Sequence, residues 1–220
     1  MRLTFTIVFI GFLSLPVRGQ DSWKNIYTES AWKERDQWQR ANDIMGKLDI
    51  EHGSKVADIG CHEGYMTLKL SKIVGASGRV YAVDVEQYKL DKLKSNLAES
   101  NIHNVITIKG DYDNPKLPTD VLDAALIIDT YHEMDDHDEI LLHVKNSLKI
   151  GGRLVICEPI AEDRRKSLRE DQERKHELGM NYALADLQKA GFSILFKQDP
   201  YIDRVKIKGD KMWLIVAQKK

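Results

Sequence analysis

The residues best placed to bind a ligand follow a short apolar run from Lys55 to Ile59. This run predicts a buried strand that carries an acidic residue, Asp58, near its end. A loop with Gly60 and Gly64 comes next, and a helix is predicted to begin near Tyr65. A strand, a tight turn and a helix start, in this order, are how many α/β sheets hold a nucleotide-like ligand.

Two further predicted strands also lead into acidic residues. The apolar run Val80 to Val83 ends at Asp84, where a carboxylate could accept hydrogen bonds from both hydroxyls of a ribose. The run Val105 to Ile108 leads into Gly110 and Asp111. Three strands in series therefore each deliver an acidic residue to the carboxyl edge of the predicted sheet.

This arrangement resembles the class I S-adenosylmethionine-dependent methyltransferases. Their loop pattern is acidic-x-Gly-x-Gly-x-Gly, and His62 stands here in place of the middle glycine. Either the backbone torsions at this position tolerate a side chain, since histidine is less disfavoured there than most residues, or cofactor binding is weakened. The resemblance implies S-adenosyl-L-methionine as the cofactor, bound by Asp58, Gly60, Cys61, Gly64, Asp84, Val85, Asp111, Tyr112 and Asp129.

Two other functions fit parts of the same pattern. An NAD-dependent oxidoreductase would also place an acidic residue such as Asp84 at a ribose. Its fingerprint, Gly-x-Gly-x-x-Gly, requires glycine at the positions of His62 and Tyr65, so this alternative is the more remote one. The other alternative is an exported, non-catalytic binding protein that keeps the methyltransferase fold.

The predicted fourth strand, Leu122 to Ile128, leads into Asp129, Thr130 and then Tyr131-His132-Glu133. The last three residues are similar to a Tyr-His-His or Tyr-His-Glu segment in methyltransferases related to the ubiquinone/menaquinone-biosynthesis group. This resemblance implies that Tyr131 faces a small-molecule acceptor, and that His132 or Glu133 serves as a base if the acceptor carries a proton. A local cap for the following helix is the alternative interpretation. We expect no metal site.

A helix is predicted at about residues 31–48, before the first strand. Its apolar residues recur at helical spacing, so it can lie across the sheet edge as a lid. The segment Arg35-x-x-Trp38-Gln39 resembles an Arg-x-x-Trp-Gln stretch that precedes the first strand in related small bacterial methyltransferases. The resemblance implies that Arg35 and Trp38 close over the cofactor carboxylate or the acceptor, although Trp38 is equally suited to the core.

The order of the predicted elements gives the fold class. Five alternating β-α units are followed by two strands, Ser193 to Lys197 and Met212 to Gln218, joined by a loop too short for a helical crossover. We therefore predict an α/β fold with a doubly wound, Rossmann-like, seven-stranded sheet that is mostly parallel and ends in an antiparallel hairpin. The charged stretch Ala161 to Gly179 is expected to be a solvated helix or mobile loop.

The charge composition of the chain limits the classes of partner that we expect. The chain has 220 residues, with 33 basic and 34 acidic side chains interspersed along it, and no basic block that indicates a nucleic acid partner. Cys61 and Cys157 lie in predicted elements about two inter-strand spacings apart, roughly 9–10 Å. A disulfide requires Cα atoms within about 7 Å, so both thiols are expected to be free.

The N-terminus has the pattern of a secretory signal peptide. A basic start is followed by an apolar run from Leu3 to Leu15, and Val17 and Gly19 suit a cut before Gln20. Residues 20–220 would then form one methyltransferase domain, with a net charge of −3 instead of −1 after the loss of two arginines and no stable membrane span. An uncleaved membrane anchor is the alternative. Because S-adenosylmethionine is made in the cytoplasm, an exported enzyme would need a supply of it.

Overall fold

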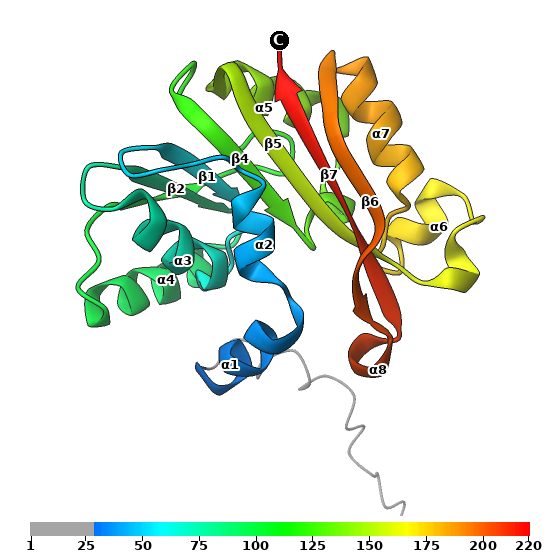
Figure 1. Cartoon of the computed structure of the whole chain (residues 1–220), viewed down its shortest axis with the longest axis horizontal. Helices are drawn as coiled ribbons and strands as arrows, with labels where there is room; N and C mark the ends of the chain where they lie inside the picture. The colour runs from blue at the N-terminus through cyan, green and yellow to red at the C-terminus, as the bar shows by residue number, and fades with distance from the viewer. Residues whose placement is uncertain (1–28) are drawn as a thin grey trace, which may run out of the picture.

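The computed structural model describes residues 29–220. Their strands form one seven-stranded sheet in the order β3-β2-β1-β4-β5-β7-β6 (Figure 1). The strands are β1 (Lys55–Ile59), β2 (Arg79–Asp84), β3 (Val105–Lys109), β4 (Leu122–Ile128), β5 (Leu148–Ile160), β6 (Phe192–Arg204) and β7 (Asp210–Lys219). The predicted α/β class and strand number are confirmed.

The direction of pairing also agrees with the prediction. Strands β3, β2, β1, β4 and β5 are parallel neighbours, whereas β7 is antiparallel to both β5 and β6. The chain runs outward from β1 to β3 and then returns to place β4 on the other side of β1. In such sheets ligands bind beyond the carboxyl ends of the strands, at the point where the order reverses.

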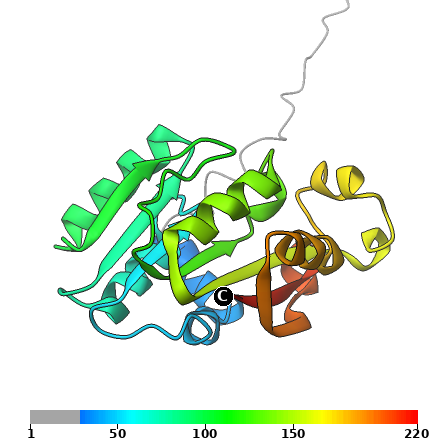
Figure 2. The ribbon, with the colours of Figure 1, turned by 90° about the horizontal axis from the view of Figure 1, so that it is seen from above.

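Helices cover both faces of the sheet (Figure 2). One apolar cluster joins α2 and α3 to one face, and another joins α5 and α7 to the opposite face. Along β4, Ala124 and Leu126 pack in the first cluster, and Ala125 and Ile127 pack in the second. The helices are α1 (Glu29–Trp38), α2 (Ala41–Gly46), α3 (Tyr65–Val74), α4 (Gln87–Glu99), α5 (His137–Ser147), α6 (Arg169–Glu173), α7 (Met180–Lys189) and α8 (Val205–Lys208), with short 3₁₀ turns η1 (Tyr131–Glu133) and η2 (Glu162–Arg164).

The predicted lid helix at 31–48 is wrong in one respect, because it is two helices. Arg40 lies between α1 and α2 with φ 53° and ψ 38°, a left-handed conformation that interrupts the helix. Its guanidinium donates to the Tyr201 carbonyl oxygen at 2.6 Å and lies 4.4 Å from the centroid of the Tyr201 ring. This contact with β6 stabilises a bend that the local helical pattern does not reveal. It leaves α1 below the carboxyl edge of the sheet (Figure 1).

The prediction of a solvated helix or mobile loop at 161–179 is also wrong in part. The segment contains η2 and α6, and Gln172 and Glu177 within it are buried. Glu177 accepts two hydrogen bonds from Arg164, at 2.8 and 2.6 Å, and one from the backbone N–H of Ala161 at 2.9 Å. These charges pair with one another at the end of β5, which is why a segment so rich in charge is ordered.

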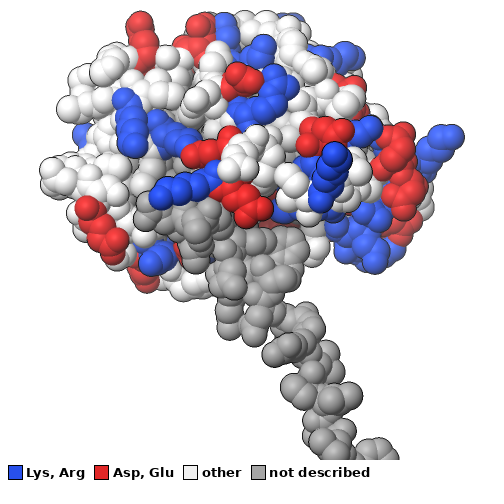
Figure 3. Space-filling model, turned by 60° about the horizontal axis from the view of Figure 1, so that its bottom comes forward, with Lys and Arg blue, Asp and Glu red and all other residues white. Residues whose placement is uncertain are grey.

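Cys61 and Cys157 are both free and buried, as predicted. Acidic and basic side chains are mixed over the face that Figure 3 shows. Among residues 29–220, no helix combines the length and the apolar character that a membrane span requires. The proposed signal peptide, residues 1–19, and the expected cut before Gln20 lie outside the described residues.

Candidate functional site

The first loop has a left-handed backbone at every second residue. Gly60, His62 and Gly64 have φ angles of 78°, 50° and 100°. This alternation explains the spacing of glycines in the loop, since glycine adopts positive φ most readily. His62 adopts the torsion that the middle glycine of the pattern would supply, so the loop geometry tolerates a side chain there.

Close packing adds a second reason for glycine at two of these positions. A Cβ at Gly60 would overlap the side chain of Thr130, which follows β4, and a Cβ at Gly64 would overlap those of Leu68 and Leu93. The loops after β1 and β4 therefore touch at Gly60. This contact lies at the point where the strand order reverses.

Asp84, at the end of β2, fastens the first loop. One carboxylate oxygen accepts from the backbone N–H of His62 and the other from that of Glu86, both at 2.9 Å. The side chain is buried, and Val85 follows it in a half-buried bend. Asp84 thus faces the first loop, and each of its oxygens has capacity for one further donor.

Asp58 and Cys61 lie beneath the loop. Asp58 is buried, accepts from the Thr67 hydroxyl at 2.5 Å, and has its pKa raised to about 6 by burial. Cys61 packs in an apolar cluster with side chains of α4, and burial raises the pKa of its thiol. Only the backbone of Cys61 is therefore available to a ligand in the loop.

The loop after β3 begins beside Asp84, because the Gly110 N–H donates to the Asp84 carbonyl oxygen at 3.1 Å. The side chains of Asp111 and Tyr112 are exposed, and Asp111 pairs with Lys116 at 2.8 Å. These two predicted cofactor-binding residues therefore lie near the site but at its solvent-facing rim.

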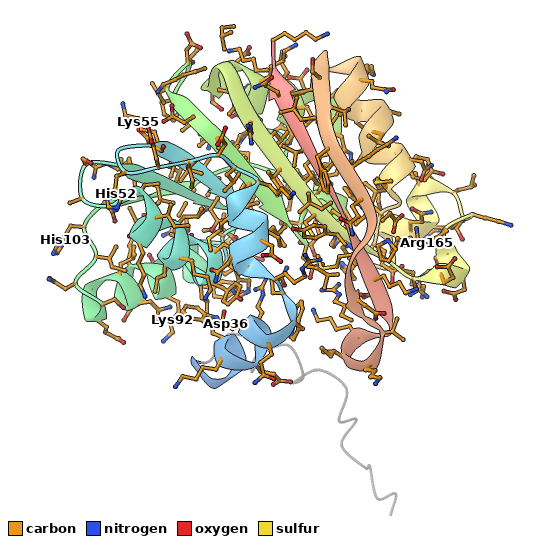
Figure 4. The ribbon with its side chains drawn as sticks, viewed as in Figure 1. Asp36, His52, Lys55, Lys92, His103 and Arg165 are labelled. Carbon is orange, nitrogen blue, oxygen red and sulfur yellow. The ribbon has the colours of Figure 1, made fainter. Side chains whose placement is uncertain are left out.

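Helix α1, the first part of the predicted lid, is attached to the start of α3. Asp36 accepts from the Tyr65 hydroxyl at 2.7 Å and pairs with Lys69 at 2.7 Å, and Figure 4 shows Asp36 at the α1 end of the molecule. The Arg35 guanidinium lies 4.2 Å from the centroid of the Tyr65 ring. Trp38 is half-buried and packs against the apolar cluster of α2 and α3.

Two buried donors in and beside α1 have no hydrogen-bond acceptor among the described residues. They are the Trp32 indole Nε1 and the Gln39 amide Nε2. The other amide atom of Gln39, Oε1, accepts from Arg35 Nε at 3.1 Å. Such unpaired buried donors cost free energy, which a ligand with acceptor oxygens would recover. Gln39 belongs to the Arg-x-x-Trp-Gln segment, but the sequence alone gave it no role.

Asp129 is held in an ion pair. Its φ is 55°, and its carboxylate accepts from Arg204 at 2.9 Å. Arg204 is buried, also pairs with Asp210, and lies 5.7 Å from the centroid of the Trp38 ring. Burial alone would raise the pKa of Asp129, but Arg204 and Lys208 hold it below its usual range. Arg204 was not predicted, because it lies in the part of β6 that extends beyond the predicted strand.

Beyond Asp129, the 3₁₀ turn η1 orients two of the predicted side chains toward different partners. His132 is buried, and its Nδ1 lies 2.5 Å from Glu158 Oε2. Burial alone would lower the pKa of His132, but Glu158 and Glu133 raise it to about 10. Tyr131 is fully buried and donates to Asp186 at 3.0 Å, so its side chain packs in the core. Glu158 lies within β5, directly after the apolar run Leu154 to Cys157, the same signal that identified Asp84.

A cleft of about 740 Å³ opens beside η1. Glu133 lines it and is about half-exposed, with a side-chain accessibility of 54 %. Charged groups of both signs form its walls. The lining residues include His132, Glu133, His137, Arg169, Glu173 and Asp186.

Comparison with known proteins agrees with this geometry. The model of the family described as "Methyltransferase domain" matches residues 50–209. A probable cobalt-precorrin-6B C(15)-methyltransferase from Saccharolobus solfataricus is 29 % identical over 67 % of this chain and 66 % of its own length. A demethylmenaquinone methyltransferase from Geobacillus sp. is 28 % identical over 53 % of this chain and 50 % of its own. The chain thus spans about half to two thirds of the length of these relatives.

Solved structures share the fold. A SAM-dependent methyltransferase from Aquifex aeolicus has a TM-score of 0.72 at 20 % identity, with 88 % of this chain and all of that chain covered. A Haemonchus contortus phosphoethanolamine N-methyltransferase, solved with S-adenosylhomocysteine, has a TM-score of 0.67 at 14 % identity over 89 % of this chain and 58 % of its own. On the family match and this shared fold, the chain belongs to the class I S-adenosylmethionine-dependent methyltransferase domain family.

Proposed function

We propose that this protein transfers the methyl group of S-adenosylmethionine to a small-molecule acceptor. The observation that carries the proposal is the first loop, whose alternating left-handed residues lie at the reversal of strand order and are fastened by Asp84. A backbone of this shape allows a ligand to approach closely. When bound, the cofactor supplies a methyl group on a positively charged sulfur.

The residues present fit this cofactor. Asp84 would accept from the ribose hydroxyls, and Asp58 provides a buried carboxylate for the ammonium group. The unpaired donors of Trp32 and Gln39, together with Arg35, form a proposed binding site for the carboxylate of the methionine tail. Arg35 is charged and Gln39 is fully buried, so a carboxylate there would be bound by charge-assisted hydrogen bonds.

The cleft beside η1 would hold the acceptor. Its mixed charge suits a polar small molecule, and His132 and Glu133 form part of its wall. Methyl transfer is an in-line displacement that depends chiefly on positioning. In this proposal Glu158 fixes His132, and Glu133, which is half-exposed in the cleft, is the group that would accept an acceptor proton. Asp111 and Tyr112 would border the adenine from the rim.

Calorimetry with S-adenosylhomocysteine tests the cofactor assignment. Asp84→Ala should weaken binding by about 1.5–3 kcal/mol, the range for hydrogen bonds that involve a charged group. The exposed Asp91→Ala serves as the control and should bind as the wild type does. Unchanged affinity in Asp84→Ala would refute the ribose role. Wild-type binding without transfer to any acceptor would favour the non-catalytic binding protein.

A comparison of two ligands tests the proposed binding site for the methionine carboxylate. Arg35→Met should weaken S-adenosylhomocysteine about tenfold or more, because a charge-assisted contact is lost. The same variant should bind 5′-methylthioadenosine, which has no amino-acid tail, with wild-type affinity. An equal loss for both ligands would show that Arg35 acts on the fold of the lid and not on the carboxylate.

We also propose that the protein is exported, on the basis of its N-terminal sequence pattern. Its acceptor would then be met outside the cytoplasm, where the cofactor must be supplied.

A further inference from the structure

We propose that His132, Glu133 and His176 bind a divalent metal ion of the zinc or cobalt type beside the acceptor cleft. One ligand atom from each of these residues lies within 4.8 Å of the other two. His132 Nε2 is 3.8 Å and His176 Nδ1 is 3.3 Å from Glu133 Oε1. The sequence predicted no metal site, because His176 lies far along the chain from the other two residues.

The second observation is the support behind His132. Its other ring nitrogen, Nδ1, faces Glu158, which is fully buried. Glu158 is itself fixed, since it accepts from the backbone N–H groups of Thr130 and Tyr131 at 2.6 and 2.9 Å. A histidine that ligates a metal commonly donates its second N–H to a carboxylate in this way, which orients the ring. The arrangement directs Nε2 toward Glu133.

The backbone around His176 brings the third ligand to the same place. His176 has a φ of 56°, a conformation uncommon for residues other than glycine. Its ring lies edge-on to that of His132, with centroids 5.8 Å apart. The next two residues hold this turn, since Glu177 binds Arg164 and the Leu178 N–H donates to the Pro159 carbonyl at 3.0 Å.

The ligand set defines the class of metal. Two imidazoles and one carboxylate suit zinc and neighbouring first-row ions better than magnesium or calcium, which prefer oxygen ligands. Three protein ligands leave coordination positions open, as in catalytic zinc sites. Because His132 and Glu133 also line the cleft, an open position could take an oxygen atom of the acceptor. The metal site itself does not depend on the proposed function.

The test measures metal binding directly on untagged, full-length protein freed of metal with a chelator. Calorimetry with Zn²⁺ and the visible absorption of added Co²⁺ should show one site in the wild type. His176→Ala and Glu133→Gln should each weaken binding about tenfold or more. The side chain of His176 is largely exposed and that of Glu133 is about half-exposed, so these variants are expected to fold.

His103→Ala is the matched control, since His103 is an exposed histidine that Figure 4 places at the far side of the molecule from Arg165 and the α6 segment. It should bind metal as the wild type does. Wild-type affinity in His176→Ala, or an equal loss in His103→Ala, would overturn the proposal. The affinity of the same variants for S-adenosylhomocysteine is measured as well. It tests the cofactor assignment independently of the metal site.

Discussion

At the scale of single residues, backbone torsion decides what the first loop can contain. His62 has the φ of a left-handed residue, and its Nδ1 accepts from the N–H of Glu63 at 2.9 Å. Burial lowers the pKa of His62 to about 3, so the ring is neutral near pH 7. A neutral ring adds no charge that would repel a cationic ligand.

We expect His62→Gly to leave S-adenosylhomocysteine affinity unchanged or to raise it. Glycine removes a strain of about 1–2 kcal/mol at this torsion, which offsets the loss of the bond to Glu63. Calorimetry measures the affinity, and a tenfold loss would show instead that His62 contacts the ligand. Gly60→Ala is the contrasting change: it should lower the free energy of unfolding, since its methyl group overlaps Thr130.

Asp58 should make stability depend on pH. Its pKa of about 6 exceeds the ordinary value of 3.8, so the folded state binds the extra proton between these values. The free energy of unfolding should therefore fall as pH rises from about 4 to 6, by up to about 3 kcal/mol. Asp58→Asn should lose this slope while still accepting from Thr67. Urea unfolding at several pH values measures it, and parallel profiles for the two proteins would contradict the assignment.

The candidate site residues that the sequence could identify are those at the ends of strands. Asp58 lies one residue before the end of its apolar run, Asp84 ends its run and Asp129 follows its run, so all three lie at the carboxyl edge. Gln39 and Arg204 gave no such signal, because their importance comes from an unpaired buried amide and from a partner 75 residues away. The ion pair on Asp129 could not be predicted for the same reason.

At the scale of elements, the short-range sequence pattern predicted several helix and strand boundaries correctly. The bounds of β1 and β4 coincide with the predicted ones, β2 ends at the predicted Asp84, and α3 begins at the predicted Tyr65, since glycine and polar residues flank compact apolar runs. β6 extends beyond the predicted Ser193 to Lys197 because it pairs with β7 as far as Arg204 with Asp210. A local sequence pattern does not reveal that a strand pairs with another strand that lies elsewhere in the chain.

The attachment of α1 to α3 gives a prediction about the lid. Asp36→Ala removes the contacts to Tyr65 and Lys69, worth about 1 kcal/mol together. Hydrogen exchange over residues 29–38 should accelerate several-fold, and S-adenosylhomocysteine should bind more weakly. Asp43→Ala removes a surface pair with Arg40 and should change neither. Equal exchange in Asp36→Ala and the wild type would show that α1 is held by its apolar contacts alone.

At the scale of the whole molecule, the N-terminal sequence gives a prediction about export. Protein recovered from its native host should begin at or near Gln20, because Val17 and Gly19 satisfy the small-residue rule. N-terminal sequencing of secreted and membrane fractions measures this. Intact Met1 in the membrane fraction would indicate an anchored enzyme. Intact Met1 in the cytosol would refute export and remove the question of cofactor supply.

The position of β7 has a consequence for how the chain acquires its structure. β7 follows β6 in sequence, yet it lies between β5 and β6 and pairs with both. During synthesis, β6 therefore emerges before the strand that joins it to the sheet. Arg204, at the end of β6, can meet Asp210 only once β7 has left the ribosome. The nascent chain should thus stay incompletely folded until β7 has been synthesised, a state that exposes β6 to chaperones.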